Sequence, residues 1–134
     1  MENCVFCKII TGQIPCHKVH ETKHSLAFLD IKPHAEGHTV IIPKKHAMTI
    51  MDLDDESTKH LILDLKETMN KIDEKLTPLA FNVGWNNGTG AGQVVPHLHI
   101  HIFPRYVDDG GESFHAIIKN PGTKSVDEIA KIFK

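Results

Sequence analysis

The chain of 134 residues lacks several features that would assign it to a class at once. It has one Trp and one Tyr, and its formal net charge at neutral pH is only −2. A charge so close to zero provides no long-range attraction for nucleic acid or for an anionic membrane. No apolar run approaches the length needed to cross a bilayer. We therefore expect neither a nucleic-acid partner nor a membrane partner.

Cysteine is also scarce, with three copies, Cys4, Cys7 and Cys16. A small and odd number argues against a framework of disulfides and favours a reducing compartment. The first residues show no basic region followed by an apolar run, so we expect no signal peptide and a cytoplasmic protein. A chain of this length predicts one domain, residues 1–134, with a core that needs no disulfide.

Histidine is what the chain has in excess, with 11 copies, and three of them alternate with apolar residues between positions 97 and 104. This period of two is typical of a half-buried strand. It would bring three imidazoles together on one face of a sheet (His97, His99 and His101). A covered imidazole must be hydrogen-bonded, metal-bound or hydrated.

Three interpretations of the histidine stretch follow. The first is an ordinary polar face of a sheet, although Thr, Lys or Glu would serve on such a face at a lower cost in free energy. The second is a metal site, because imidazole is a common metal ligand. The third is a site where histidine acts as a nucleophile or acid/base on a phosphate or acyl group.

Cys4 and Cys7 have the spacing Cys-x-x-Cys. This spacing suits half of a zinc site, a redox pair or neither. Redox motifs of this kind usually follow a strand and begin a helix in a βαβ unit, and the sequence shows no such unit. We therefore prefer a zinc half-site, which needs two more ligands from elsewhere in the chain. Cys16 is interpreted as an ordinary thiol.

The rest of the pattern predicts strands and one long helix. Residues 54–76 carry apolar side chains at spacings of three and four, which is typical of a helix that packs one face on a core. Seven further segments read as strands or as a short terminal helix (strands at 17–21, 25–29, 38–43, 79–85, 97–104 and 114–118; helix at 125–133). This order predicts an α+β fold with a mostly antiparallel sheet of about five strands.

A loop rich in Gly and Asn, residues 86–93, leads into the histidine stretch. Alone it predicts only a flexible turn. Directly before three histidines it also predicts a cradle of backbone N–H groups for an anion, because glycine lets the backbone approach a ligand closely.

The run His-Leu-His-Ile-His-Ile-Phe-Pro, with Gly92-Gln93 just before it, resembles the signature of the histidine triad (HIT) family. Further matches in the family's order and spacing cover nearly the whole chain (Asp30-Ile31, Gly37-His38-Thr39, Ile42-Pro43-Lys44-Lys45-His46 and Ala91-Gly92-Gln93). The resemblance implies a HIT-like fold and a homodimer whose two sheets join. It also implies binding of a purine nucleotide or nucleotide conjugate, with hydrolysis or transfer at the α-phosphate.

The resemblance also implies roles for individual positions. His99 corresponds to the nucleophile that takes the nucleotidyl group, His101 to the histidine beside the phosphate, and His38 to another active-site histidine. The implied contacts with ribose, base and phosphate come from eight residues (Asp30, Ile31, Asn86, Gly92, Gln93, Val94, His99 and His101). Val94 departs from the many phosphoramidate-cleaving members that have Ser there, and valine cannot donate a hydrogen bond to the leaving amine.

A subset of the family, mainly bacterial-type proteins, shares the Cys-x-x-Cys and resembles this chain in that feature. It implies a structural zinc held by two thiolates and two imidazoles (Cys4, Cys7, His46 and His97), which leaves the other two triad histidines for chemistry. Three alternatives stay open. One is nucleotidyl transfer to another acceptor, and one is a regulatory protein that binds nucleotides or partner proteins with weak residual catalysis. The last is a catalytic zinc held by all three triad histidines.

Overall fold

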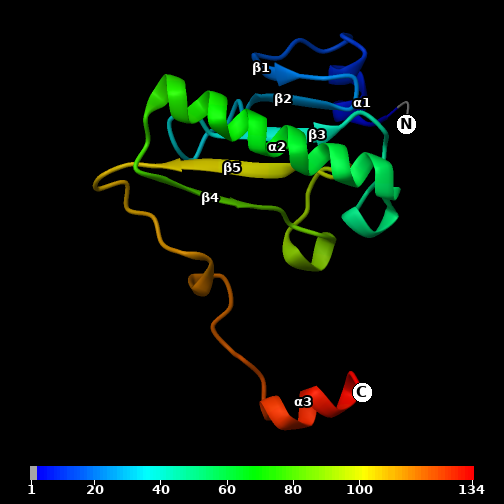
Figure 1. The fold of residues 1–134 in the computed structure, drawn as a ribbon, viewed down its shortest axis with the longest axis vertical. Helices are drawn as coiled ribbons and strands as arrows, with labels where there is room; N and C mark the ends of the chain where they lie inside the picture. The colour runs from blue at the N-terminus through cyan, green and yellow to red at the C-terminus, as the bar shows by residue number, and fades with distance from the viewer. Residues whose placement is uncertain (1–2) are drawn as a thin grey trace.

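The computed structural model describes residues 3–134. Five strands form one antiparallel sheet in the order β1-β2-β3-β5-β4 (β1 Lys18–Glu21, β2 Ser25–Leu29, β3 Thr39–Pro43, β4 Ala80–Gly84 and β5 Ile100–Arg105). The long helix α2 (Asp55–Leu76) crosses one face of this sheet (Figure 1). A short helix α1 (Val5–Ile10) and a terminal helix α3 (Val126–Ile132) complete the regular elements. The predicted α+β fold, with about five strands, one long helix and a short terminal helix, is confirmed.

The boundaries of α2 follow from capping chemistry. The Asp54 carboxylate accepts a hydrogen bond of 2.8 Å from the Ser57 N–H, which satisfies one of the free donors of the first turn. The helix ends at Thr77, whose backbone is left-handed with φ of 45°. The predicted apolar stripe packs into the core (Leu61 and Ile72 buried, Leu65 and Met69 partly buried).

Alternation along the strands divides the apolar core between the two faces of the sheet. One cluster lies under α2 (Ala27, Ile41, Ile100 and Ile102 with the α2 stripe). The other lies under α1 (Leu26, Phe28, Val40 and Ile42, with Phe6, Ile9 and Ile10 packed against it). Helix α1 was not predicted, because six residues are too few to show a period. A helix this short depends on tertiary packing for its stability.

The histidine stretch begins its strand later than predicted. β5 starts at Ile100, and its pairs with β3 run from Ile100 with Ile41 to Ile102 with Thr39. His97 and His99 therefore precede the ladder. The cause lies in local bonding, because the His97 N–H donates to Val95 O at 2.8 Å and the fully buried His97 ring turns toward α1.

Residues 114–118 do not form the predicted strand. They contain a 3-10 turn, η3 (Phe114–Ala116); two further 3-10 turns, η1 (Ile50–Asp52) and η2 (Thr89–Ala91), occur earlier in the chain. The Ser113 hydroxyl accepts the His115 N–H at 3.4 Å, and the Ala116 N–H donates to Ser113 O at 3.1 Å. These local bonds offer the backbone an alternative to pairing with a strand.

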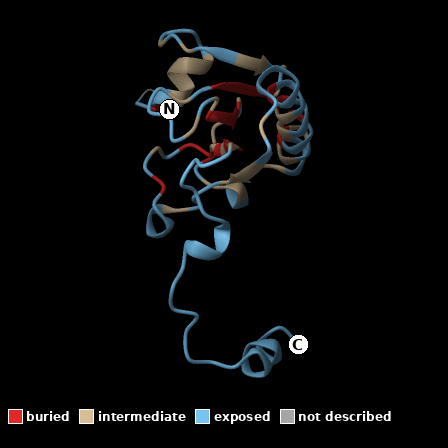
Figure 2. Cartoon of the chain, turned by 90° about the vertical axis from the view of Figure 1, so that its left-hand side faces the viewer, coloured by how far each residue is buried: buried red, intermediate tan, exposed pale blue. Residues whose placement is uncertain are grey.

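The chain after the sheet forms an extended tail. Every residue from 107 to 134 is exposed, and Figures 1 and 2 show α3 standing away from the body. α3 begins with a capping box, in which the Glu128 N–H donates to Ser125 Oγ at 3.1 Å and the Ser125 N–H donates to Glu128 Oε1 at 3.3 Å. Across residues 3–134 no helix combines the length and the apolar character that a membrane span requires.

Candidate active site and metal centre

Two thiols and two imidazoles meet beside α1. They belong to Cys4, Cys7, His46 and His97, and one ligand atom of each lies within 4.8 Å of the others. The His97 Nδ1 atom lies 3.4 Å from Cys4 Sγ and 3.6 Å from Cys7 Sγ. The His46 Nδ1 atom lies 3.3 Å from Cys7 Sγ and 3.1 Å from His97 Nδ1. The four residues could therefore hold a metal ion.

The geometry of this cluster fits a tetrahedral cation. In a tetrahedral zinc site with bonds of ordinary length, a sulfur ligand and a nitrogen ligand lie about 3.6 Å apart, and two nitrogen ligands lie about 3.3 Å apart. The His97 Nε2–H donates to Pro43 O at 2.9 Å, so the Nδ1 atom carries a lone pair aimed at the other three ligands. Burial and the nearby Cys4 raise the pKa of Cys7 when no cation is present. A bound divalent cation would reverse that shift and satisfy all four ligands.

A second set of histidines forms a hydrogen-bonded chain. The backbone N–H of His34 donates to His38 Nδ1 at 3.1 Å, so this nitrogen must be an acceptor. A neutral His38 then carries its proton on Nε2 and donates to His101 Nδ1 at 2.9 Å. His101 in turn must carry its proton on Nε2. The main-chain N–H of His34 thus sets the tautomers of both rings. The proton on His38 Nε2 accounts for the 2.9 Å distance between the two ring nitrogens, so no cation is needed between them.

Burial favours the neutral forms that this chain requires. It lowers the pKa of His101 to about 4, assisted by the nearby His99 and His38. It also lowers the pKa of His38, although Asp30 opposes that shift. The His38 Nε2 atom lies 3.6 Å from Asp30 Oδ2. Both rings therefore stay uncharged at neutral pH and keep the order of donors and acceptors.

His99 lies next to this chain with its own tautomer set by the backbone. Its Nδ1–H donates to His97 O at 2.8 Å, because a carbonyl oxygen can only accept. A neutral His99 then has its lone pair on Nε2. The centroid of its ring lies 5.1 Å from that of His101 and 5.1 Å from that of Phe6. This is the arrangement that a histidine nucleophile needs.

A cavity of about 290 Å³ opens beside these rings. Its lining combines predicted and unpredicted residues (predicted Asp30, His38, Asn86 and His101; unpredicted His34, Gly84, Trp85, Phe103, Phe114 and Ile117). Five predicted residues do not line it (Ile31 and Val94, which are 84% and 88% exposed, and Gly92, Gln93 and His99). The tail contributes one wall of the cavity through Phe114, whose ring packs on Gly84.

The glycine loop is held by its own bonds. The buried Gln93 side chain accepts the Gly88 N–H at 2.7 Å and donates to Met48 O and Val95 O at 2.8 and 3.0 Å. The N–H groups of Ala91, Gly92 and Gln93 donate to carbonyls within the loop. The role of Gly92 and Gln93 as an anion cradle stays a prediction, and an anion there would compete with these bonds.

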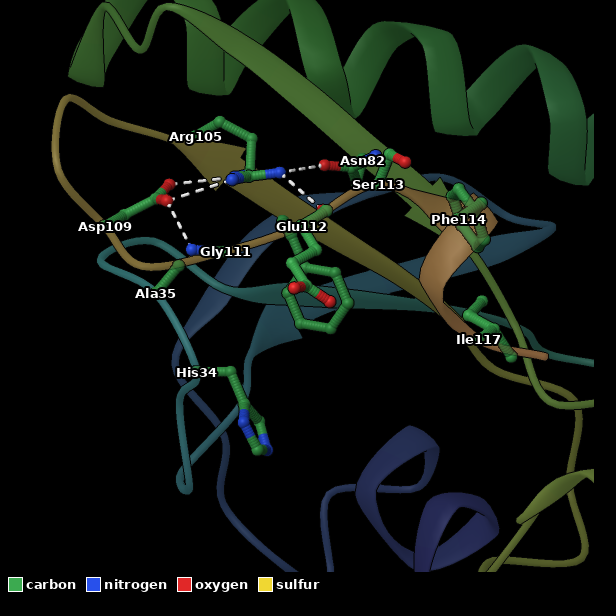
Figure 3. Close-up of a pocket in the computed structure, with 11 residues that line it drawn as sticks. His34, Ala35, Asn82, Arg105, Asp109, Gly111, Glu112, Ser113, Phe114 and Ile117 are labelled. Atoms are coloured by element: carbon green, nitrogen blue, oxygen red, sulfur yellow. Dashed lines mark hydrogen bonds and ion pairs between the residues drawn. The ribbon is translucent and has the colours of Figure 1, made fainter. Parts of the chain in front are cut away.

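A second cavity, of about 330 Å³, adjoins the first and shares four lining residues with it (His34, Phe103, Phe114 and Ile117). Figure 3 shows its one arginine engaged within the protein. The Arg105 guanidinium donates to both Asp109 oxygens at 2.8 and 2.9 Å, and to Asn82 Oδ1 and Glu112 O at 2.6 and 2.9 Å. The Arg105 guanidinium lowers the pKa of the Asp109 carboxyl. Its hydrogen bonds also hold the tail against β4 and β5.

Sequence reasoning missed several residues of the two sites. His34 sets the tautomer of His38 through its backbone N–H, and the Phe103 ring lies 4.4 Å from that of His38. The ring of Phe6 contacts His97 and His99 edge-on. The position of Phe6 between the two cysteines in the sequence could have indicated that it lies close to the metal cluster. Cys16 lies outside the metal cluster, as expected, and packs against the core under α1.

Comparison with known proteins finds one family and close structural neighbours. The family model described as HIT domain matches residues 11–108, which leaves Cys4 and Cys7 outside the match. The chain is 44% identical over 109 residues to adenosine 5'-monophosphoramidase of Schizosaccharomyces pombe, covering 81% of this chain and 79% of the relative. A HIT family protein from Bacillus anthracis superposes with a TM-score of 0.82 at 37% identity, covering 98% and 93%. A HIT family hydrolase from Legionella pneumophila gives 0.67 at 41% identity, covering 75% and 91%.

Proposed function

The chain belongs to the HIT domain family, and we propose that it is a nucleotide hydrolase that acts at an α-phosphate through a nucleotidyl-histidine intermediate. The observation that carries the proposal is the pair of His99 contacts. Its Nδ1–H donates to His97 O, which leaves the lone pair of a neutral ring on Nε2, and the centroid of this ring lies 5.1 Å from that of the neutral His101. Relatives named adenosine 5'-monophosphoramidase support this class of reaction.

The proposed reaction has two displacements at phosphorus. First, His99 Nε2 attacks the α-phosphorus, and the bond to the leaving group breaks with its electron pair. The Nε2–H of the neutral His101 then donates a hydrogen bond to a phosphate oxygen, and the leaving group takes its proton from solvent water. Second, water attacks the phosphorus of the adduct, which releases a nucleoside monophosphate and regenerates His99. Splitting the reaction in this way replaces one difficult step with two easier ones.

The substrate in this proposal is a purine nucleotide conjugate, either a nucleoside phosphoramidate or a dinucleoside polyphosphate. Asp30 binds the ribose, Ile31 lies against the base, and Asn86 and the loop at Gly92-Gln93 hold the phosphate. Asp30 and Asn86 line the same cavity as His38 and His101, which supports this assignment. Val94, at 88% exposure, would meet the leaving group without offering it a hydrogen bond.

The cluster of Cys4, Cys7, His46 and His97 is proposed to hold one structural zinc. Two thiolates and two imidazoles make a closed tetrahedral set without a position for substrate. This assignment leaves His99 and His101 for the chemistry. It disfavours a catalytic zinc held by all three triad histidines, because the rings of His97 and His99 form bonds with different partners.

Side-by-side turnover assays test the proposed function. We expect the purified protein to hydrolyse adenosine 5'-monophosphoramidate to AMP, and diadenosine polyphosphate at a rate that depends on Val94. A Val94→Ser variant should favour the phosphoramidate, because a hydroxyl can donate to the leaving amine. Tight nucleotide binding with no turnover of either substrate would instead identify a nucleotide-binding regulatory protein.

A further inference from the structure

The segment that carries His99 lies outside the hydrogen-bonded ladder of the sheet. β5 pairs with β3 from Ile100 onward. Upstream of that point, the Leu98 N–H donates to Ala47 O at 2.8 Å and links the segment to the chain after β3. A nucleophile placed before the start of its strand needs another source of rigidity, because a displacement of about 1 Å can cost about 100-fold in rate.

The metal cluster lies next to the Leu98–Ala47 bond. Ala47 follows His46, and Leu98 follows His97, while the Nδ1 atoms of the two histidines lie 3.1 Å apart. An ion bound by both rings would therefore clamp the same two segments that the Leu98–Ala47 bond joins. His97 is held on its other side as well, because its Nε2–H donates to Pro43 O at the end of β3.

His97 belongs to both sites at once. Its ring takes part in the metal cluster, and its carbonyl accepts the Nδ1–H of His99. A displacement of the whole residue that removes the ring from the cluster would also move the carbonyl that sets the His99 tautomer, whereas a rotation about the side-chain bonds would move the ring alone. The fully buried ring leaves no room for the two motions to separate.

Phe6 provides a second connection between the cluster and His99. It lies between the two cysteines at the start of α1, where Cys4 Sγ accepts the Cys7 N–H at 3.4 Å. Its ring meets His99 edge-on with a centroid distance of 5.1 Å, and it meets His97 at 5.9 Å. The Phe6 ring also packs against Phe28 of the sheet, and bonds from the two cysteines to an ion would add a second restraint on it.

We propose that the metal centre positions the nucleophile, through the His97 carbonyl and the Phe6 ring, in addition to stabilising the fold. His97 and Phe6 are then positioning residues for His99. The inference rests on the proposed role of His99. It predicts that loss of the ion lowers kcat far more than it raises KM, because Asp30 and Asn86 lie on other segments. It also predicts that a metal-free protein loses the single Nδ1–H tautomer of His99.

Two matched cysteine variants test the proposal. Cys7→Ser removes a cluster ligand, whereas Cys16→Ser removes a half-buried thiol outside the cluster. Zinc content, kcat and KM on adenosine 5'-monophosphoramidate, and the imidazole ¹⁵N NMR signals of His99 are measured for both. We expect Cys7→Ser to lose zinc, to lose about 10- to 100-fold in kcat with KM little changed, and to show mixed His99 tautomers. Cys16→Ser should match the wild type in all three.

A third variant keeps the test decisive if Cys7→Ser does not fold. Phe6→Leu retains all four ligands and should keep its zinc, yet it should lower kcat and broaden the His99 signals. An unchanged kcat and a single Nδ1–H tautomer in folded, zinc-free Cys7→Ser, or in Phe6→Leu, would overturn the proposal. If the wild type shows no turnover, the proposed function fails. The tautomer comparison then still decides whether the metal positions His99.

Discussion

The three triad histidines use their ring nitrogens in three different ways. His97 directs Nδ1 to the metal cluster and Nε2–H to Pro43 O. His99 donates its Nδ1–H to a carbonyl, and His101 accepts at Nδ1 from His38. Carbonyl oxygens, which can only accept, fix the tautomers of His97 and His99, and the backbone N–H of His34 fixes that of His101 through His38. This difference, rather than residue type, separates the proposed roles.

Replacing the proposed nucleophile gives the sharpest residue-level prediction. We expect His99→Ala to lose nearly all turnover while keeping nucleotide affinity, because Asp30 and Asn86 would still hold the ligand. Replacing His101 should slow the reaction by a smaller factor, on the order of 10²–10⁴. Mass spectrometry of a quenched wild-type reaction should show an AMP-sized adduct on the peptide that contains His99. Substantial activity in His99→Ala, or an adduct on another residue, would contradict the assignment.

The buried state of His101 predicts how stability depends on pH. Its pKa is about 4 in the folded protein, against an ordinary value near 6.5 in the unfolded chain. Between these values the unfolded chain binds a proton that the folded protein does not, so stability falls as the pH is lowered from about 6.5 to 4. Denaturant unfolding of His101→Asn should show a shallower fall over this window. Parallel curves for the variant and the wild type would show that His101 does not contribute.

Two helices show how differently local pattern and packing stabilise an element. α2 has its own cap, its own dipole complement and an apolar stripe over 22 residues, so its position follows from the local sequence. α1 has six residues and is held by Phe6, Ile9 and Ile10 on the sheet and by the two cysteines at its start. We therefore expect α2 to be unaffected by removal of any cation from the cluster, and α1 to be destabilised by it.

The stripe of α2 makes a quantitative prediction at the element scale. Leu61 is fully buried among the residues between α2 and the sheet. Leu61→Ala should lower the free energy of unfolding by about 2–5 kcal/mol, because it leaves a cavity in the core. Lys66→Ala, on the exposed side of the same helix, should change it by about 0.5 kcal/mol or less. Urea denaturation of both variants checks this difference, and similar losses would mean that the stripe is not the packing face.

At the scale of the whole molecule, the C-terminal tail stays exposed against the rest of residues 3–134. Residues 107–134 are exposed, and α3 carries apolar side chains on its surface (Val126, Ile129 and Ile132, with Phe133 after it). A seven-residue helix is not stable alone in water. The family resemblance and this exposed apolar surface together support the proposed homodimer.

Light scattering measures the proposed dimer directly. We expect a mass of twice the 15.0 kDa of one chain for the purified protein at micromolar concentration. Ile129→Asp and Ile132→Asp together should weaken association if α3 contacts the second copy, because a buried carboxylate would lack a partner. A monomer of the wild-type chain at that concentration would remove the proposal.

Much of the architecture was accessible from the sequence because it depends on local periods. Strands at 25–29 and 38–43 and the helix at 54–76 follow from patterns that repeat every two or every three to four residues. The triad and the Cys-x-x-Cys were visible for the same reason. Residues 114–118 were predicted wrongly, because Ser113 bonds the backbone locally and no period reveals that.

The tertiary structure alone decided what each chemical group contacts. The alternation of His97, His99 and His101 places three equivalent imidazoles on one strand, whereas the folded chain starts the strand at Ile100 and buries the first ring among sulfur and nitrogen ligands. Pro43, which fixes that ring, lies 54 residues away, and Cys4 lies 93 residues away. The direction of a lone pair depends on partners so distant along the chain that no local pattern can specify it.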